Sequence, residues 1–172
     1  MKWCDIIIRV GDIMIIKGTS CYENAKSGNL VSITGDGGNA WGFFGNSYKK
    51  LAPRLYLWQY YDANPDNLNE DELIDWYIKE FYQLRLKDLN AYDLLDILNQ
   101  KFGEEIILLC HELPGFELNK DHFCHRRLLA DWIELETGLV VPEISIDEDG
   151  SVRQELVYDL KPKIKMLIKN LK

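Results

Sequence analysis

Residues 90–137 read NAYDLLDILNQKFGEEIILLCHELPGFELNKDHFCHRRLLADWIELET. Apolar residues recur at helical spacing from Asn90 until Gly103, which is a natural helix stop. The continuous apolar run Ile106–Cys110 then predicts a strand covered on both faces, and a second helix follows a loop. This order predicts an α/β fold in three layers, with a mostly parallel central sheet that includes Ile106–Cys110 and helices on both faces.

The remaining sequence predicts further elements around this unit. Apolar periodicity and turn residues place strands at 5–10, 13–17, 29–34, 139–146 and 152–160, and helices from Asn69 and over 162–171. Thr19 or Ser20 is expected to cap a short helical turn. No repeat or linker divides the chain, so we expect one domain over 1–172, with a C-terminal extension from about residue 140.

Composition limits the classes of function. The chain has 172 residues and is 47% hydrophobic, which is typical of a folded domain. It has neither an apolar run of the roughly 18–20 residues that span a membrane nor a leader pattern, so we expect a cytoplasmic protein without a membrane partner. Residues 65–150 carry seven basic and twenty-one acidic residues. Such a charge argues against bulk nucleic-acid binding but permits a small anionic ligand.

The four cysteines are expected to be free thiols, because their spacing resembles no disulfide scaffold. All three histidines and two of the cysteines lie between residues 110 and 125. This stretch occupies the place between a strand end and a helix start where open α/β sheets bind ligands. The sequence therefore predicts the functional site here.

Arg126 and Arg127 lie at the predicted helix start, where free N–H groups and the helix dipole attract anions. A bound anion, such as the phosphate of a nucleotide, would explain them. The alternative is that they pair with the nearby acidic residues Glu112, Glu117 or Asp121.

Cys124 at the same helix start should have a lowered pKa, since the dipole and the arginines favour its thiolate. It is a candidate nucleophile or ligand contact, and Glu112 or His125 would move protons. Cys110 is expected to contact the ligand or to be a buried thiol. Neither cysteine has an arginine six residues on, so the loop of cysteine phosphatases is excluded.

A metal site and a cofactor are not expected. The segment contains five cysteine and histidine residues that can bind a metal ion, but it has no Cys-x2-Cys or His-x3-His pair. In addition, Cys110 and His111 would point to opposite faces if both lay on the strand.

Three residues nearer the N-terminus are predicted to complete the pocket. Ser20 and Asn24 follow an early strand, and Tyr48 ends a glycine-rich and aromatic loop at 35–48. We expect them to bind the ligand together with Cys110 and Arg126, and Tyr48 could stack on a planar ring. The alternative for the loop is an ordinary long surface turn.

Several segments resemble the "domain of unknown function 488" family. They are LLCHE at 108–112, PG at 114–115 and FCHRRLLADW at 123–132, with weaker agreement at Thr19-Ser20, Tyr22, Asn24, Ile33, Gly45, Tyr48 and 51–53. The chain departs from the pattern by a longer insertion between Gly115 and Phe123 and by the C-terminal extension. The resemblance implies a compact α/β fold carried by bacteria and their phages, and no established reaction.

Two functions remain open from the sequence. One is an enzyme acting on a nucleotide or nucleoside derivative at the Cys-His-Arg helix start. The other is a non-catalytic module that binds a nucleotide or a protein, in the setting of phage–host conflict. The sequence gives no indication of the oligomeric state.

Overall fold

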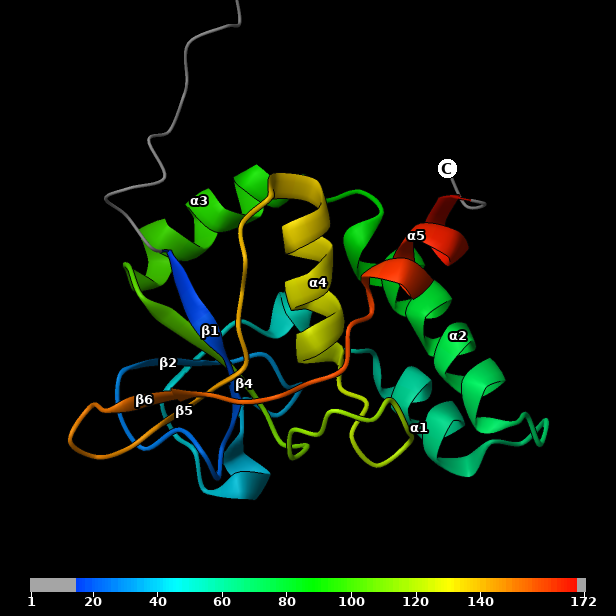
Figure 1. Ribbon diagram of the computed structural model, residues 1–172, viewed down its shortest axis with the longest axis horizontal. Coiled ribbons are helices and arrows are strands. Elements are labelled where there is room, and N and C mark those ends of the chain that lie inside the picture. The colour runs from blue at the N-terminus through cyan, green and yellow to red at the C-terminus, as the bar shows by residue number, and fades with distance from the viewer. Residues whose placement is uncertain (1–14, 170–172) are drawn as a thin grey trace, which may run out of the picture.

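The computed structural model describes residues 15–169, and its centre is a four-stranded parallel sheet (Figure 1). The strand order is β1 (Ile16–Cys21), β4 (Ile106–Cys110), β2 (Asn29–Ser32) and β3 (Asn46–Ser47). Strand β4 pairs in parallel with both β1 and β2, and all five of its residues are buried. The predicted α/β class and the central position of Ile106–Cys110 are therefore confirmed. The strand predicted at 5–10 lies outside the described residues.

Over residues 15–169, five α-helices accompany the sheet, and side-chain caps mark the starts of two of them. They are α1 (Leu55–Ala63), α2 (Glu70–Phe81), α3 (Ala91–Phe102), α4 (His125–Thr137) and α5 (Lys161–Lys169). Asn69 and Glu72 form a reciprocal capping box at the start of α2, and Asn90 caps α3. Short helical turns lie at Asn39–Trp41, Lys49–Leu51 and Tyr82–Leu86.

The two faces of the sheet have different covers. Ile106 and Leu108 belong to the large core that the helices share, and α4 contacts both β1 and β4. Ile107 and Leu109 point the other way and pack against an antiparallel hairpin of β5 (Ile144–Ile146) and β6 (Val152–Gln154). In Figure 1, α1, α2 and α5 gather on one side of α4 and the hairpin lies on the other.

The hairpin replaces the helices that we expected on the second face. The chain beyond α4 returns as a short strand whose alternate residues Ile144 and Ile146 are apolar, and these two side chains fill the face that Ile107 and Leu109 present. The expected helical turn after Thr19 or Ser20 is also wrong, because both residues lie within β1 and pair with β4.

The C-terminal helix packs on the body of the protein. Ile164, Leu167 and Ile168 are buried in the main core, and Lys163 bonds Asp71 and Asp75 of α2 at 2.8 and 2.5 Å. The C-terminal helix therefore packs against the acidic middle of the chain. Within residues 15–169, none of the helices has the length and apolar character that crossing a membrane requires.

Candidate active site

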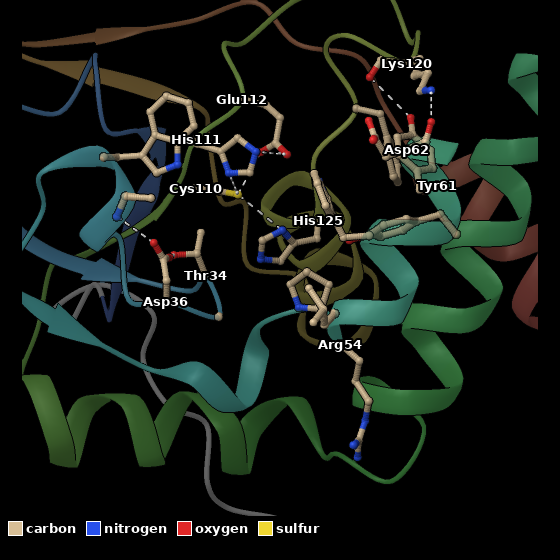
Figure 2. Close-up of a pocket in the computed structure, with 18 of the residues that line it drawn as sticks. Thr34, Asp36, Arg54, Tyr61, Asp62, Cys110, His111, Glu112, Lys120 and His125 are labelled. Carbon is tan, nitrogen blue, oxygen red and sulfur yellow. Dashed lines mark hydrogen bonds and ion pairs between the residues drawn. The ribbon is translucent and has the colours of Figure 1, made fainter. Parts of the chain in front are cut away.

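A cavity of about 890 Å³ opens at the carboxyl end of the parallel sheet. Its walls come from the segments that follow β2 and β4, from α1 and the two residues before it, from Tyr77 of α2, and from the loop that leads into α4 with the first residue of that helix. Cys110, His111, Glu112 and His125 lie together on one side of it, as Figure 2 shows. This edge of an open α/β sheet is where such folds bind ligands.

Two thiols and an imidazole meet at the start of α4. The Nδ1 atom of His125 lies 3.5 Å from the Sγ of Cys110 and 3.9 Å from the Sγ of Cys124. The opposite ring nitrogen, Nε2, lies 2.9 Å from the carbonyl oxygen of Ile33. All three side chains are buried, but Cys110 and His125 line the cavity.

The two thiols have opposite tendencies to ionise. Burial raises the pKa of Cys110 well above its ordinary value, and the neighbouring Cys124 and Glu112 add to this. Burial opposes ionisation of Cys124 as well, but its interaction with the neighbouring Cys110 thiol and the charge of Arg126 outweigh this effect and lower the pKa of Cys124 to about 6. The lowered pKa of Cys124 agrees with the sequence prediction, which attributed it to the helix dipole and the arginines and not to Cys110.

Glu112 connects this group to His111. One carboxylate oxygen accepts a hydrogen bond from the Cys110 thiol at 2.9 Å, and the other lies 3.1 Å from His111 Nε2. Burial disfavours the carboxylate, but the hydrogen bond and charge of His111 prevail and hold the pKa of Glu112 well below its usual range. Glu112 is therefore ionised at neutral pH.

His111 also shows why the argument from opposite faces is wrong. Strand β4 ends at Cys110, so His111 lies beyond the pleat and its Nδ1 comes within 3.8 Å of the Cys110 Sγ. Its ring stacks on Trp41, with centroids 5.1 Å apart and planes 5° from parallel.

Arg126 does not line the cavity. Its side chain is fully buried, and its Nε and Nη2 atoms bond Glu143 at 3.0 and 2.8 Å. Its Nη1 atom lies 3.9 Å from Glu112. Arg127 bonds Thr19, the Val141 carbonyl and Asp131. The arginines are thus neutralised internally, chiefly by Glu143, which is not among the partners expected from the sequence.

The three predicted N-terminal residues lie apart from the cavity walls. Ser20 pairs with Leu109 in β1, so its side chain points to the face opposite Cys110. Asn24 lies in the turn after β1, where its carbonyl accepts from Ile146 N–H. Tyr48 is buried in the main core and packs edge-on against Phe102. None of them lines the cavity.

Aromatic residues that were not predicted from the sequence as site residues form much of the wall. Trp41 comes from the predicted glycine-rich loop, whereas Trp58 and Tyr61 come from α1, which we did not predict. The backbone N–H of Cys124 donates to the Tyr158 hydroxyl at 2.8 Å, and this hydroxyl donates to the His122 carbonyl. Tyr158 thereby holds the start of α4 in place.

The His111–Glu112 pair leads to a pH prediction. The hydrogen bond that His111 donates to Glu112 raises the pKa of His111 against the effect of burial. The stability from this pair is therefore complete below the ordinary histidine pKa and is lost as pH rises through the raised value. In Glu112→Gln the pKa of His111 should fall below about 6.5, because burial and the charge of Arg126 then outweigh the opposing effect of Cys124. An NMR titration of the imidazole measures this, and an unchanged pKa would contradict the pairing.

Comparison of the chain with protein-family models, curated proteins and solved structures finds no match. The resemblance to the "domain of unknown function 488" family therefore stays a prediction. What can be proposed about function comes from the fold class and from the cavity itself.

Proposed function

We propose that the protein is an enzyme that acts on a planar, amino-substituted nitrogen heterocycle of the nucleoside type. The observation that carries the proposal is the cavity itself, in which aromatic walls lead directly to a cluster of reactive groups at Cys110, Glu112 and His125. Stacking surfaces beside converging polar groups are characteristic of sites for small planar ligands.

The charges of the wall favour a neutral or cationic ring over a phosphate. Four carboxylates line the cavity, at Asp36, Asp62, Glu112 and Asp121. Of the two cations, Lys120 donates to the Asp62 carbonyl at 3.1 Å, and the guanidinium of Arg54 extends away from the Cys110 group in Figure 2. The proposal thus keeps the nucleoside part of the sequence prediction and abandons the phosphate site at Arg126.

Carboxylates also suit the amino groups of such a ring. An ionised carboxylate only accepts hydrogen bonds, so Asp62, Asp121 and Glu112 would select ligands with N–H donors. The Asp36 carboxylate accepts from the N–H groups of Gly38 and Ala40 and from Thr34. Asp36 therefore shapes the loop that presents Trp41.

The test is a binding and turnover assay with the four common nucleosides and their 5′-monophosphates. At least one nucleoside should bind more tightly than its monophosphate and be converted to a product that mass spectrometry detects. Trp41→Ala should weaken binding about 5- to 150-fold, since stacking on one aromatic residue contributes about 1–3 kcal/mol. Phe116→Ala is the matched control, because Phe116 is 70% exposed and lies outside the cavity wall.

Two results would contradict the proposal. Binding without any conversion would favour the non-catalytic module instead. Failure of every nucleoside to bind would reject the ligand class.

A further inference from the structure

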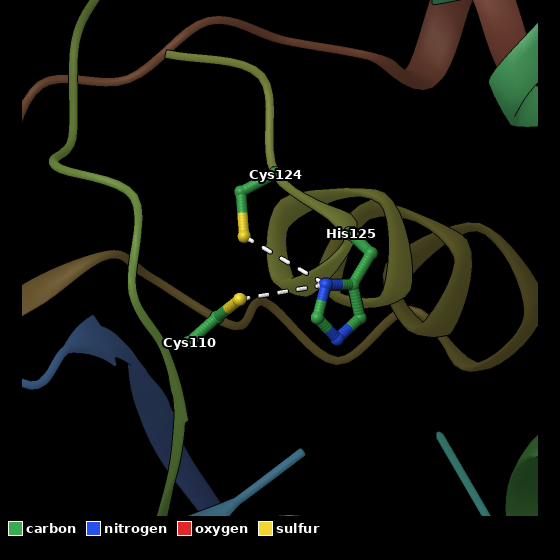
Figure 3. A group of neighbouring side chains, drawn as sticks. All are labelled: Cys110, Cys124 and His125. Carbon is green, nitrogen blue, oxygen red and sulfur yellow. Dashed lines mark hydrogen bonds between the residues drawn. The ribbon is translucent and has the colours of Figure 1, made fainter. Parts of the chain in front are cut away.

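We propose that Cys110, Cys124 and His125 form a binding site for a divalent metal ion of the zinc class, with its fourth position open to the cavity. Figure 3 shows the three side chains, which come from the end of β4 and the start of α4 and converge on one point. Their sulfur and nitrogen atoms all lie within 4.8 Å of one another. The metal site goes beyond the proposed function, and its test needs no nucleoside.

The first argument is the tautomer of His125. The Ile33 carbonyl can only accept a hydrogen bond, so the Nε2 atom at 2.9 Å must carry the ring proton. The Nδ1 atom then has a free lone pair when the ring is neutral, and this lone pair faces two sulfur atoms. Metal-bound histidines are characteristically held in this way, with the second N–H donated to a carbonyl or carboxylate.

The second argument is distance. With zinc–sulfur and zinc–nitrogen bonds of about 2.3 and 2.05 Å, a tetrahedral site places its sulfur and nitrogen ligands about 3.6 Å apart. The observed sulfur-to-Nδ1 distances are 3.5 Å for Cys110 and 3.9 Å for Cys124. Both sulfur-to-nitrogen separations are therefore already close to those that an ion would require.

The third argument is the backbone, which lets adjacent residues serve as ligands. Cys124 is the residue before α4 and has extended dihedral angles, φ −142° and ψ 141°, whereas His125 is the first helical residue. The change from extended to helical backbone turns both side chains toward Cys110. A Cys-x2-Cys motif, whose absence argued against a metal in the sequence, is unnecessary for this arrangement.

The fourth argument is access and charge. Cys110 and His125 line the cavity, so an ion can enter without unfolding of the protein. A dication would neutralise two neighbouring thiolates, which would otherwise repel each other. Metal binding would remove the Cys110 proton that the Glu112 carboxylate accepts at 2.9 Å, which frees this carboxylate oxygen to accept another proton close to the ion.

This arrangement defines a reaction class, which rests on the proposed function. Three protein ligands and an open position are typical of catalytic zinc, which lowers the pKa of a bound water. The water would give a proton to Glu112, and its oxygen would form a bond to the amino-bearing ring carbon. The carbon–nitrogen bond then breaks, its electron pair leaves with the nitrogen, and Glu112 returns the proton. Water is consumed and ammonia released, as in zinc-dependent base deamination.

Metal binding is tested on protein that has been stripped with a chelator under reducing conditions. Titration with Co²⁺ should give one ion per chain and a sulfur-to-cobalt charge-transfer absorption, and Zn²⁺ should displace it. Cys110→Ser, Cys124→Ser and His125→Ala should each weaken Zn²⁺ binding by about 100-fold or more. Cys21→Ser is the matched control, because Cys21 is a buried free thiol that pairs with Cys110 in the sheet but lies outside the group.

A second measurement covers the case in which a variant fails to fold. Zn²⁺ should protect Cys110 and Cys124 of the unmodified protein from alkylation, as mass spectrometry can resolve. Absence of the charge-transfer absorption in folded, reduced protein would overturn the proposal. The proposal would also be overturned if mass spectrometry showed a loss of two mass units from a Cys110–Cys124 disulfide and the reduced protein still bound no metal. Metal binding without nucleoside turnover would refute the proposed reaction and leave the metal site supported.

Discussion

Glu143→Ala is expected to lower the free energy of unfolding by about 3–5 kcal/mol, because it leaves a buried arginine without its counter-charge. Glu143 is 1% exposed, and its carboxylate bonds Arg126 through two guanidinium nitrogens and Thr19 at 2.5 Å. It also lies 3.9 Å from Arg127. Urea denaturation followed by circular dichroism measures the loss.

Glu148→Ala is the control for this substitution. Glu148 is exposed in the turn between β5 and β6, where surface substitutions change stability by about 0.5 kcal/mol or less. Equal effects of the two substitutions would show that Glu143 does not neutralise Arg126. Glu143→Gln should have an intermediate effect, since the amide keeps an acceptor for Arg126 but loses the charge.

The Glu143 contacts show why the sequence misled us about the arginines. The weighed partners were Glu112, Glu117 and Asp121, all near the helix start in the sequence. The main partner instead arrives from residue 143, beyond α4, where the isolated acid stands among apolar residues in the run VVPEISI. A charged residue in such an apolar run could have indicated that Glu143 is the partner of a buried arginine, because buried charges are almost always paired.

Elements with strong local signals were predicted well. The continuous apolar run correctly predicted β4, and the capping residues Asn69 and Asn90 correctly predicted the starts of α2 and α3. Helix α1 was missed because apolar residues lie on all sides of it, so it has no amphipathic pattern. Leu57 and Tyr61 are buried, whereas Leu55 and Trp58 are exposed.

The candidate site was predictable only where its residues are close in sequence. Cys110, Glu112, Cys124 and His125 lie within sixteen residues and come together in the structure. The aromatic wall depends on tertiary packing, which brings Trp41 onto His111 across seventy residues of chain. Tyr48, which we predicted as the stacking residue, comes directly after β3 and is buried in the main core. Its ring packs against Phe102 and does not point toward Cys110.

Substitution of two adjacent residues of β4 compares how rigidly the helices and the hairpin cover the two faces of the sheet. Leu108 and Leu109 are both fully buried, but Leu108 faces the helices and Leu109 faces the hairpin. Each substitution by alanine should cost about 2–5 kcal/mol, and the exact cost depends on how far the surroundings collapse into the space left behind. We expect the larger loss for Leu108→Ala, because the interlocked helices cannot shift as easily as one two-stranded hairpin.

Denaturation of Leu108→Ala, Leu109→Ala and the exposed control Leu156→Ala measures this difference. Leu156 is 82% exposed, so its substitution should have almost no effect. A Leu109→Ala loss equal to or above that of Leu108→Ala would show that the hairpin is as rigid a cover as the helices. In that case β5 and β6 would be an integral layer of the fold, and the region beyond residue 140 could not be regarded as an extension of it.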